Sequence, residues 1–334
     1  MNESLKIGYN IGTLLSIDQI IKFAKQIDQK ENIDSLWIPE SWGREAFVSL
    51  GAISQVTKKV RLGTAILSIH SRTPATVAMG VSTLDILSNQ RVVLGLGVST
   101  PALSENWHGT KFEHPLEKLK EYIQCIRLIL KGTRVNFAGK YYKINNFKIL
   151  IKPPRENLPI YTAAVHKKMI DLSCEMANGI LLYLRPKSEL PKTVEYIKNK
   201  MAMNKHRKGE SFEICCAFIT AVSEKDPSTA RLRAKKTLAF YVAVGNYYSN
   251  FLQLCGFHTE VQNITEEYKK NGLINIHEFV SDKMLDSLTI SGSKEECIKS
   301  LNEFIKSGIS LPIMQINPVG IDPENSIMEL ISTF

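Results

Sequence analysis

Several common signatures of protein chemistry are missing from this sequence. Its 334 residues include only six cysteines, none in a Cys-x-x-Cys pair or at metal-ligand spacing. We therefore expect all six to be reduced and mostly packed, as in a cytoplasmic protein, and we predict no metal site. No P-loop, His-Glu-x-x-His or Gly-x-Ser-x-Gly motif occurs, and no Gly-x-Gly-x-x-Gly opens a helix after the first expected strand.

Long apolar runs are missing as well. No stretch reaches the roughly 18 apolar residues that a membrane helix needs. The opening MNESLKIGYN has no apolar run after its charge, so we expect neither a signal peptide nor a membrane partner. The formal net charge is +9, but lysine and arginine are spread over expected helix faces. This favours a solvated basic surface, or an anionic ligand, over nucleic-acid binding.

What the sequence does contain is an alternation of buried strands and amphipathic helices. Hydrophobic residues make up 44% and charged residues 22% of the chain, enough for one large core. About eight strand–helix units predict an α/β fold, a (β/α)8 TIM barrel, as a single domain over residues 1–334. Two insertions enlarge it: a hairpin at Arg134–Tyr142 and short helices at about 246–290. A doubly wound sheet is the alternative.

The stretch Gln90–Gly109 is the central part of the expected site. Its apolar run predicts a strand buried on both faces, and Gly95 and Gly97 leave bare backbone that a flat ligand could approach. Polar and aromatic residues follow the strand, where α/β proteins place their chemistry; they are Ser99, Glu105, Trp107 and His108. The pattern fits a planar redox ring with Glu105 transferring a proton beside it. It equally fits a glycine-containing core strand followed by an ordinary loop.

Other expected strands end in similar residues. Asn10 closes the first, Glu40 and Trp42 follow the second, and His70 follows Val60–Ile69. An aromatic residue after a strand is more often packing than catalysis. A histidine at such a place, as at 70, 108 and 166, could carry protons or serve structure.

Four runs resemble a known family: PESWGREAF, RLGTAILSIHSRTPATVAM, TLDILSNQRVVLGLGVS with ENWHG, and SGSKEEC with GISLPIMQINPVGIDPE. They resemble the luciferase-like superfamily over nearly the whole chain, and within it the branch that uses the deazaflavin coenzyme F420. The segment Lys236–Pro318 is also similar to the 5,10-methylenetetrahydromethanopterin reductases of one-carbon metabolism.

The resemblance implies a site by position. A non-prolyl cis peptide would fall at Ala65–Ile66, where the family supports the ring from behind. Glu40 and Ser41 match the acidic residue beside the ring and its polar neighbour, although the usual pair is Asp-His. Trp42 matches a tryptophan near the hydride carbon in related dehydrogenases.

Further positions follow in the same way. Glu105 matches the family's acid–base glutamate, and Gly97 and Ser99 would line the ring. The loop Ala164–Lys168 would hold the coenzyme phosphate, with Ala164, Val165, His166 and Lys167 as its binding residues; the branch usually has Gly-Pro-Lys where this chain has Val165-His166-Lys167. Asn10 stands where the methanopterin reductases have a glutamate, so the proton transfer falls to Glu105 or the substrate differs.

The resemblance implies an oxidoreductase that transfers a hydride between coenzyme F420 and a small organic substrate. The best specific expectation is 5,10-methylenetetrahydromethanopterin. Burial between Trp42 and Trp107 would raise the pKa of Glu105 toward neutrality. The alternatives are an FMN-dependent luciferase-like monooxygenase and a non-catalytic F420-binding barrel. We expect a homodimer or higher homo-oligomer, with the 246–290 insertion acting as a lid or an oligomer contact.

Overall fold

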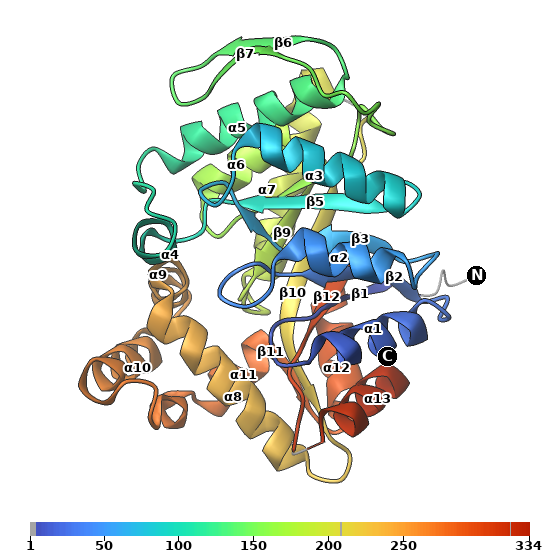
Figure 1. Cartoon of the computed structure of the whole chain (residues 1–334). Coiled ribbons are helices and arrows are strands. Elements are labelled where there is room, and N and C mark those ends of the chain that lie inside the picture. Colours follow the sequence, from blue (N-terminus) through green and yellow to red (C-terminus); the bar gives the residue numbers. More distant parts are fainter. Residues whose placement is uncertain (1–4, 208, 321) are drawn as a thin grey trace. The chain divides into compact units, whose positions relative to one another are not determined.

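The computed structural model describes residues 5–207, 209–320 and 322–334 (Figure 1). Its internal contacts divide the chain into two compact units. Unit 1 comprises the described residues of Met1–Leu181 together with His206–Glu213. Unit 2 comprises Leu182–Lys205 and the described residues of Ile214–Phe334. The expectation of a single domain stays a prediction.

Unit 1 is built on parallel strands paired in the order β1-β2-β3-β5-β8-β9. Their bounds are β1 (Ile7–Asn10), β2 (Ile33–Ile38), β3 (Arg61–Thr64), β5 (Val92–Gly97), β8 (Ile160–Ala163) and β9 (Gly179–Tyr183, whose last two residues belong to unit 2). All six residues of β5 are buried, as expected for a parallel strand covered on both faces.

The third expected strand is interrupted. It divides into β3 and the two-residue β4 (Leu67–Ser68), which pairs with β5 so that Ser68 lies opposite Gly97. The peptide bond between Ala65 and Ile66 is cis, at the position that the resemblance implied. The expectation of one continuous strand over Val60–Ile69 was therefore wrong.

Helices of unit 1 begin where the sequence supplies caps. Ser16 and Gln19 form a capping box for α1 (Ile17–Ile27), and Thr73 caps α3 (Pro74–Leu87) with proline in its first turn. The other helices of this unit are α2 (Ala46–Ser54), α4 (Pro101–Asn106), α5 (Pro115–Leu130) and α6 (Lys167–Met176).

The predicted hairpin is present. Strands β6 (Val135–Ala138) and β7 (Lys143–Phe147) pair antiparallel, slightly beyond the predicted range. They form a small core with α3 and α5, made of Ala78, Ile129, Val135 and Ile149.

Unit 2 pairs its parallel strands in the order β11-β10-β12. Their bounds are β10 (Glu213–Val222, whose first residue belongs to unit 1), β11 (Thr289–Gly292) and β12 (Leu311–Ile316). The helices are α7 (Leu190–Met203), α8 (Pro227–Val244), α9 (Asn246–Leu254), α10 (His258–Asn271), α11 (Asp282–Leu288), α12 (Lys294–Ile305) and α13 (Pro323–Thr333), with the short 3-10 turn η2 (Ile276–Phe279). A second short 3-10 turn, η1 (Lys205–Arg207), leads from unit 2 back into unit 1. The 246–290 region is helical, as expected, until β11 begins at Thr289.

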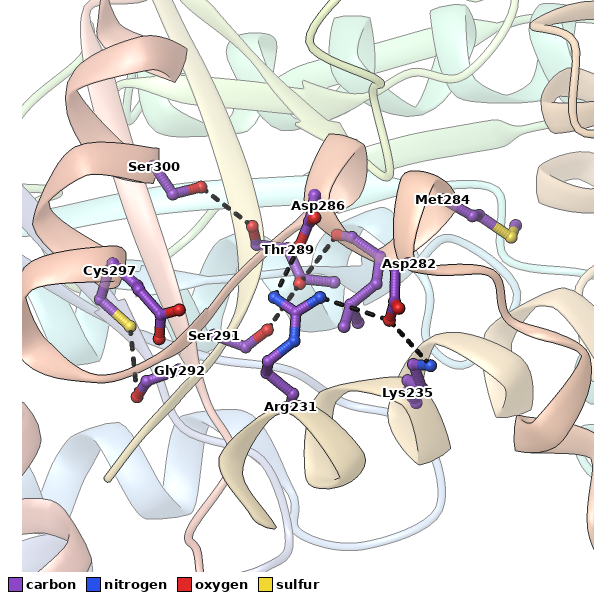
Figure 2. Close-up of polar contacts among 12 residues, drawn as sticks. Arg231, Lys235, Asp282, Met284, Asp286, Thr289, Ser291, Gly292, Cys297 and Ser300 are labelled. Atoms are coloured by element: carbon purple, nitrogen blue, oxygen red, sulfur yellow. Dashed lines mark hydrogen bonds and ion pairs between the residues drawn. The ribbon is translucent and has the colours of Figure 1, made fainter. Parts of the chain in front are cut away.

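A polar network fastens α11 to α8 (Figure 2). Arg231 donates to Asp286 at 2.7 Å and contacts Asp282 at 3.4 Å, and Lys235 lies 3.0 Å from Asp282. The hydrogen bond from Lys235, followed by its charge and then the bond from Arg231, lowers the pKa of Asp282. The insertion is thus held to α8 by its own charges as well as by a shared apolar core.

The eight successive parallel strands β1, β2, β3, β5, β8, β9, β10 and β12, connected by helices, define the fold as a (β/α)8 TIM barrel with insertions, as the sequence predicts. All six cysteines are free thiols. Over the described residues, no helix is long and apolar enough to cross a bilayer, and no cluster of three metal-ligating side chains occurs.

Gly95 of β5 lies close to the backbone of Thr64 at the end of β3. A Cβ at this position would lie 1.9 Å from the carbonyl oxygen of Thr64. The Thr64 hydroxyl also accepts from the Gly95 N–H and donates to the Gly95 carbonyl, both at 2.8 Å. The bare backbone at Gly95 therefore admits the neighbouring strand, and the expectation that it serves a flat ligand was wrong there.

We expect Gly95→Ala to reduce the free energy of unfolding by about 1–3 kcal/mol, because the added methyl forces β3 and β5 apart. Urea unfolding measures this. Gly51→Ala in α2 is the control: no atom lies within 4 Å of its added Cβ, and the helix should gain up to about 1 kcal/mol. A Gly95→Ala protein as stable as the wild type would contradict the close approach.

Candidate functional site

The predicted site residues lie in unit 1, at the carboxyl ends of neighbouring strands. Glu40, Ser41 and Trp42 follow β2, Ala65 and Ile66 lie between β3 and β4, Gly97 ends β5 and Ser99 follows it, and Ala164 to Lys167 follow β8. Pairing of β2 with β3, β4 with β5 and β5 with β8 brings these ends to one edge of the sheet.

The Ile66 side chain packs on Gly97. A Cβ on Gly97 would lie 2.8 Å from Ile66 Cδ1, so glycine is what lets Ile66 cover this end of β5. The Ala65 N–H donates to the Ile38 carbonyl at 2.9 Å, and the Glu40 N–H donates to the Ile66 carbonyl at 3.4 Å. Ala65 and Ile66 themselves are only half-buried. The segment is thus fixed by its backbone while its side chains stay accessible.

Two tryptophans stand beside this edge. Trp42 and Trp107 contact edge to face, with ring centroids 5.8 Å apart and planes at 86°. Their exposed fractions are 49% and 53%, far above those of core aromatic residues. An exposed aromatic pair on polar loops is the kind of surface against which a planar ligand packs.

Glu105 lies on the short helix α4, not in a loop. Its Oε1 accepts from the Phe112 N–H at 3.0 Å, and its side chain is exposed. Trp42 and Trp107 therefore do not bury it, and the expected apolar enclosure of Glu105 was wrong. α4 ends at Asn106, and the indole of Trp107, the residue that follows, packs on Trp42.

Glu40 is an ion-pair partner. Both of its carboxylate oxygens contact the Arg72 guanidinium, the pair from Nη2 to Oε2 measuring 2.7 Å, and Oε2 also accepts from the Ala46 N–H at 2.9 Å. Arg72 in turn contacts Glu45, the residue that caps α2. The hydrogen bond that Arg72 donates to Glu40 is the main reason that the pKa of Arg72 is raised.

The expected phosphate loop leads into α6. His166 occupies the position before the helix, and Lys167 and Lys168 in its first turn are exposed. A helix N-terminus with exposed cations attracts anions through its N–H groups and its dipole. The chemistry of this segment suits a phosphate although its sequence departs from Gly-Pro-Lys.

Two buried polar atoms at strand ends lack a hydrogen-bond partner within the described chain. They are Asn10 Oδ1 at the end of β1 and His70 Nε2 just after β4. The His70 ring packs on Phe112 with centroids 5.4 Å apart. Burial, and then the charges of Lys118 and His108, lower the pKa of His70. Such unsatisfied buried atoms are rare in proteins and are commonly completed by water or a ligand.

Sequence reasoning missed Arg72 and Thr64, although both lie in the runs that it singled out. The sequence did carry a signal for Arg72: the run PESWGREAF contains two carboxylates, Glu40 and Glu45. Such a pair needs a cation nearby, and the segment after β4 supplies Arg72 where it meets the segment after β2. Unit 2 has its own polar cluster at strand ends: the Tyr183 hydroxyl donates to Gln315 at 2.5 Å, and the Gln315 amide donates to the Tyr241 hydroxyl at 3.2 Å.

The fold and the strand-end residues define a (β/α)8-barrel protein with a candidate binding site at the carboxyl ends of its strands. The chain matches the luciferase-like monooxygenase family over residues 6–311. It belongs to that family.

Individual relatives add detail. The chain is 26% identical over 315 residues to a 5,10-methylenetetrahydromethanopterin reductase of Archaeoglobus fulgidus, covering 92% of each. It is 27% identical to a putative coenzyme F420-dependent oxidoreductase of Mycobacterium tuberculosis, covering 84% of this chain and 86% of that one. The solved F420-dependent tetrahydromethanopterin reductase of Methanopyrus kandleri superposes with a TM-score of 0.82 at 20% identity, covering 99% of both chains.

His70 should make stability depend on pH. Its folded pKa lies below its ordinary value of about 6.5, so between the two values the unfolded chain binds more protons and stability rises with pH. We therefore expect His70→Gln to lose less stability than the wild type when the pH falls from about 7.5 to 5.5. Urea unfolding at both values measures this.

The same substitution at the exposed His258 of α10 is the control, and it should leave the pH dependence as in the wild type. Equal acid sensitivity of His70→Gln and the wild type would contradict the burial of a neutral His70.

Proposed function

We propose that this protein is a coenzyme F420-dependent oxidoreductase that exchanges a hydride between the deazaflavin and a small organic substrate. The observation that carries this proposal is the packing of Ile66 on Gly97 at the strand ends of unit 1, together with the exposed Trp42–Trp107 pair on the segments that follow β2 and α4. The putative coenzyme F420-dependent oxidoreductase of Mycobacterium tuberculosis, 27% identical to this chain, supports it.

The residues present suit such a coenzyme. Ile66 and the two indoles offer apolar surface for a tricyclic ring, and the first turn of α6 with Lys167 offers N–H groups and positive charge for a phosphate. The unpartnered Asn10 Oδ1 and His70 Nε2 offer polar contacts at the same strand ends. When bound, the coenzyme would supply the hydride chemistry, and the protein would orient the reactants and handle the proton.

We assign proton transfer to Glu105. Its carboxylate is exposed and is held through one oxygen by the Phe112 N–H, so it is oriented and still accessible to a substrate. Glu40, by contrast, is committed to Arg72. Asn10 cannot donate a proton as a carboxylic acid does.

For the substrate we propose 5,10-methylenetetrahydromethanopterin, on the strength of the reductases from Archaeoglobus fulgidus and Methanolobus tindarius, each 26% identical. Such a reaction would place the protein in one-carbon metabolism. We further propose a cytoplasmic homo-oligomer. Six free thiols suit a reducing compartment, and exposed apolar side chains on α2 and α3, including Val48 and Ile86, suit a subunit contact.

A second candidate is an FMN-dependent monooxygenase, which the name of the family, luciferase-like monooxygenase, favours. Equilibrium binding separates the two. We expect the purified protein to quench the fluorescence of F420 at far lower concentration than that of FMN. Preference for FMN, together with flavin absorbance in the purified protein, would overturn the proposal in favour of the monooxygenase. Binding of F420 without turnover would leave a non-catalytic barrel.

Glu105→Gln tests the assigned proton transfer. We expect it to retain F420 affinity and to lower turnover of methylenetetrahydromethanopterin by roughly 100-fold or more, because glutamine keeps the contact with Phe112 but holds no titratable proton. Steady-state kinetics and coenzyme titration measure the two effects. Glu113→Gln, an exposed carboxylate that pairs with Lys111, is the control. Unchanged turnover of Glu105→Gln would remove Glu105 from the mechanism.

A further inference from the structure

The loop from Glu40 to Glu45 carries Ser41 and Trp42 between two carboxylates, and a single guanidinium binds both of these carboxylates. Arg72 Nη1 contacts Glu40 Oε1, and Nη2 contacts both Glu40 Oε2 and Glu45 Oε1. The side chains of Arg72 and Glu40 are only 17% and 14% exposed. Bidentate arginine–carboxylate pairs of this kind fix orientation as well as charge.

Arg72 is itself held on several sides. Its carbonyl accepts from the Tyr122 hydroxyl of α5 at 3.0 Å, its Nη1 lies 3.3 Å from the Ser71 hydroxyl, and its guanidinium lies over the Phe47 ring at 5.8 Å. The guanidinium is therefore held in place on the segment after β4, and it binds both ends of the loop that follows β2.

Glu40 has little capacity left for a ligand. A carboxylate offers about four acceptor positions. Arg72 takes two of these positions, and the Ala46 N–H, at the start of α2, takes a third. A carboxylate engaged in this way cannot turn toward a ring without releasing its cation.

Trp42 lies on this loop. Half of its surface is exposed, and its ring contacts the equally exposed Trp107 edge to face. Arg44 ties the same loop to the carbonyls of Gly12 and Leu15. The loop would therefore stay attached without Arg72, but its Glu40 end would be released beside an uncompensated Glu45.

We propose that Glu40 anchors this loop and does not contact the coenzyme ring, and that Arg72 is the positioning residue that sets Trp42 at the binding face. This assignment rests on the proposed function. It differs from the role that the resemblance implied for Glu40.

Four variants test the proposal: Arg72→Met, Arg72→Lys and Glu40→Gln, each alone, and the double variant Arg72→Met/Glu40→Gln. The first readout is the near-ultraviolet circular dichroism of the protein without coenzyme, which reports the Trp42–Trp107 pair. We expect each variant to lose most of the signal that Trp42→Phe removes from the wild type. The second readout is F420 affinity by fluorescence quenching. Each single variant should bind about tenfold or more weakly, and the double variant no more weakly than the single ones, because all break one interaction.

Arg155→Met is the matched control. Arg155 forms the same bidentate pair with the buried Asp85, but at the amino end of β5, where it also donates to the Val92 carbonyl at 2.7 Å. It should lower thermal stability and leave both the tryptophan signal and the affinity for F420 unchanged. An equal loss in Arg155→Met would show a global effect and overturn the proposal.

Two other results would overturn it. If the effects of Arg72→Met and Glu40→Gln on affinity multiply in the double variant, Glu40 contacts the coenzyme independently. If Arg72→Lys and Glu40→Gln fold and keep the full tryptophan signal, Arg72 does not position Trp42. Failure of the wild type to bind F420 would overturn the proposed function alone, since the dichroism of the coenzyme-free protein still decides the role of Arg72.

Discussion

The close contact between β3 and β5 at Thr64 and Gly95 is the constraint on which the candidate site depends. The Thr64 hydroxyl bonds both backbone groups of Gly95, and its carbonyl occupies the place of a side chain there. Immediately beyond this contact the chain leaves β3, so that Ile66 lies on Gly97. A larger residue at 95 would move the edge at which the ends of β2, β4, β5 and β8 meet.

Two carboxylates near that edge have been given opposite surroundings by the fold. Glu40 is half-buried and bound to Arg72 and the Ala46 N–H. Glu105 is exposed and bound by one N–H on the segment after α4. The first arrangement fixes the carboxylate in place, and the second leaves the carboxylate accessible to a substrate. This difference is the physical basis for assigning positioning to one and proton transfer to the other.

The two units differ in what stabilises them. In unit 1, Arg61 at the amino end of β3 bonds Asp34, Glu213 and the Tyr161 hydroxyl. These contacts join strand starts, at the end opposite the candidate site, where stability can be gained without constraining a ligand. In unit 2, the insertion packs its own apolar core against α8, and the Arg231 network adds surface ion pairs of small individual contribution.

The sequence alone determined the alternation of strands and helices, because apolar periodicity and capping residues act over a few neighbouring positions. Helices begin directly after Ser16, Thr73 and Asp226, because each of these side chains accepts a hydrogen bond from a backbone N–H in the first turn. Resemblance to a known family added the position of the cis bond at Ala65–Ile66. Neither could reveal which polar groups would meet.

Tertiary structure decided the surroundings of each candidate residue. Arg72 and Glu40 are 32 positions apart, and only the adjacency of two strand ends pairs them. From the sequence, Trp42 and Trp107 were expected to enclose Glu105. In the structure, Glu105 lies on the short helix α4 with its side chain exposed, and the two indoles pack on each other. Local sequence fixes backbone conformation, whereas burial and charge at a site depend on residues that the chain brings together from far apart.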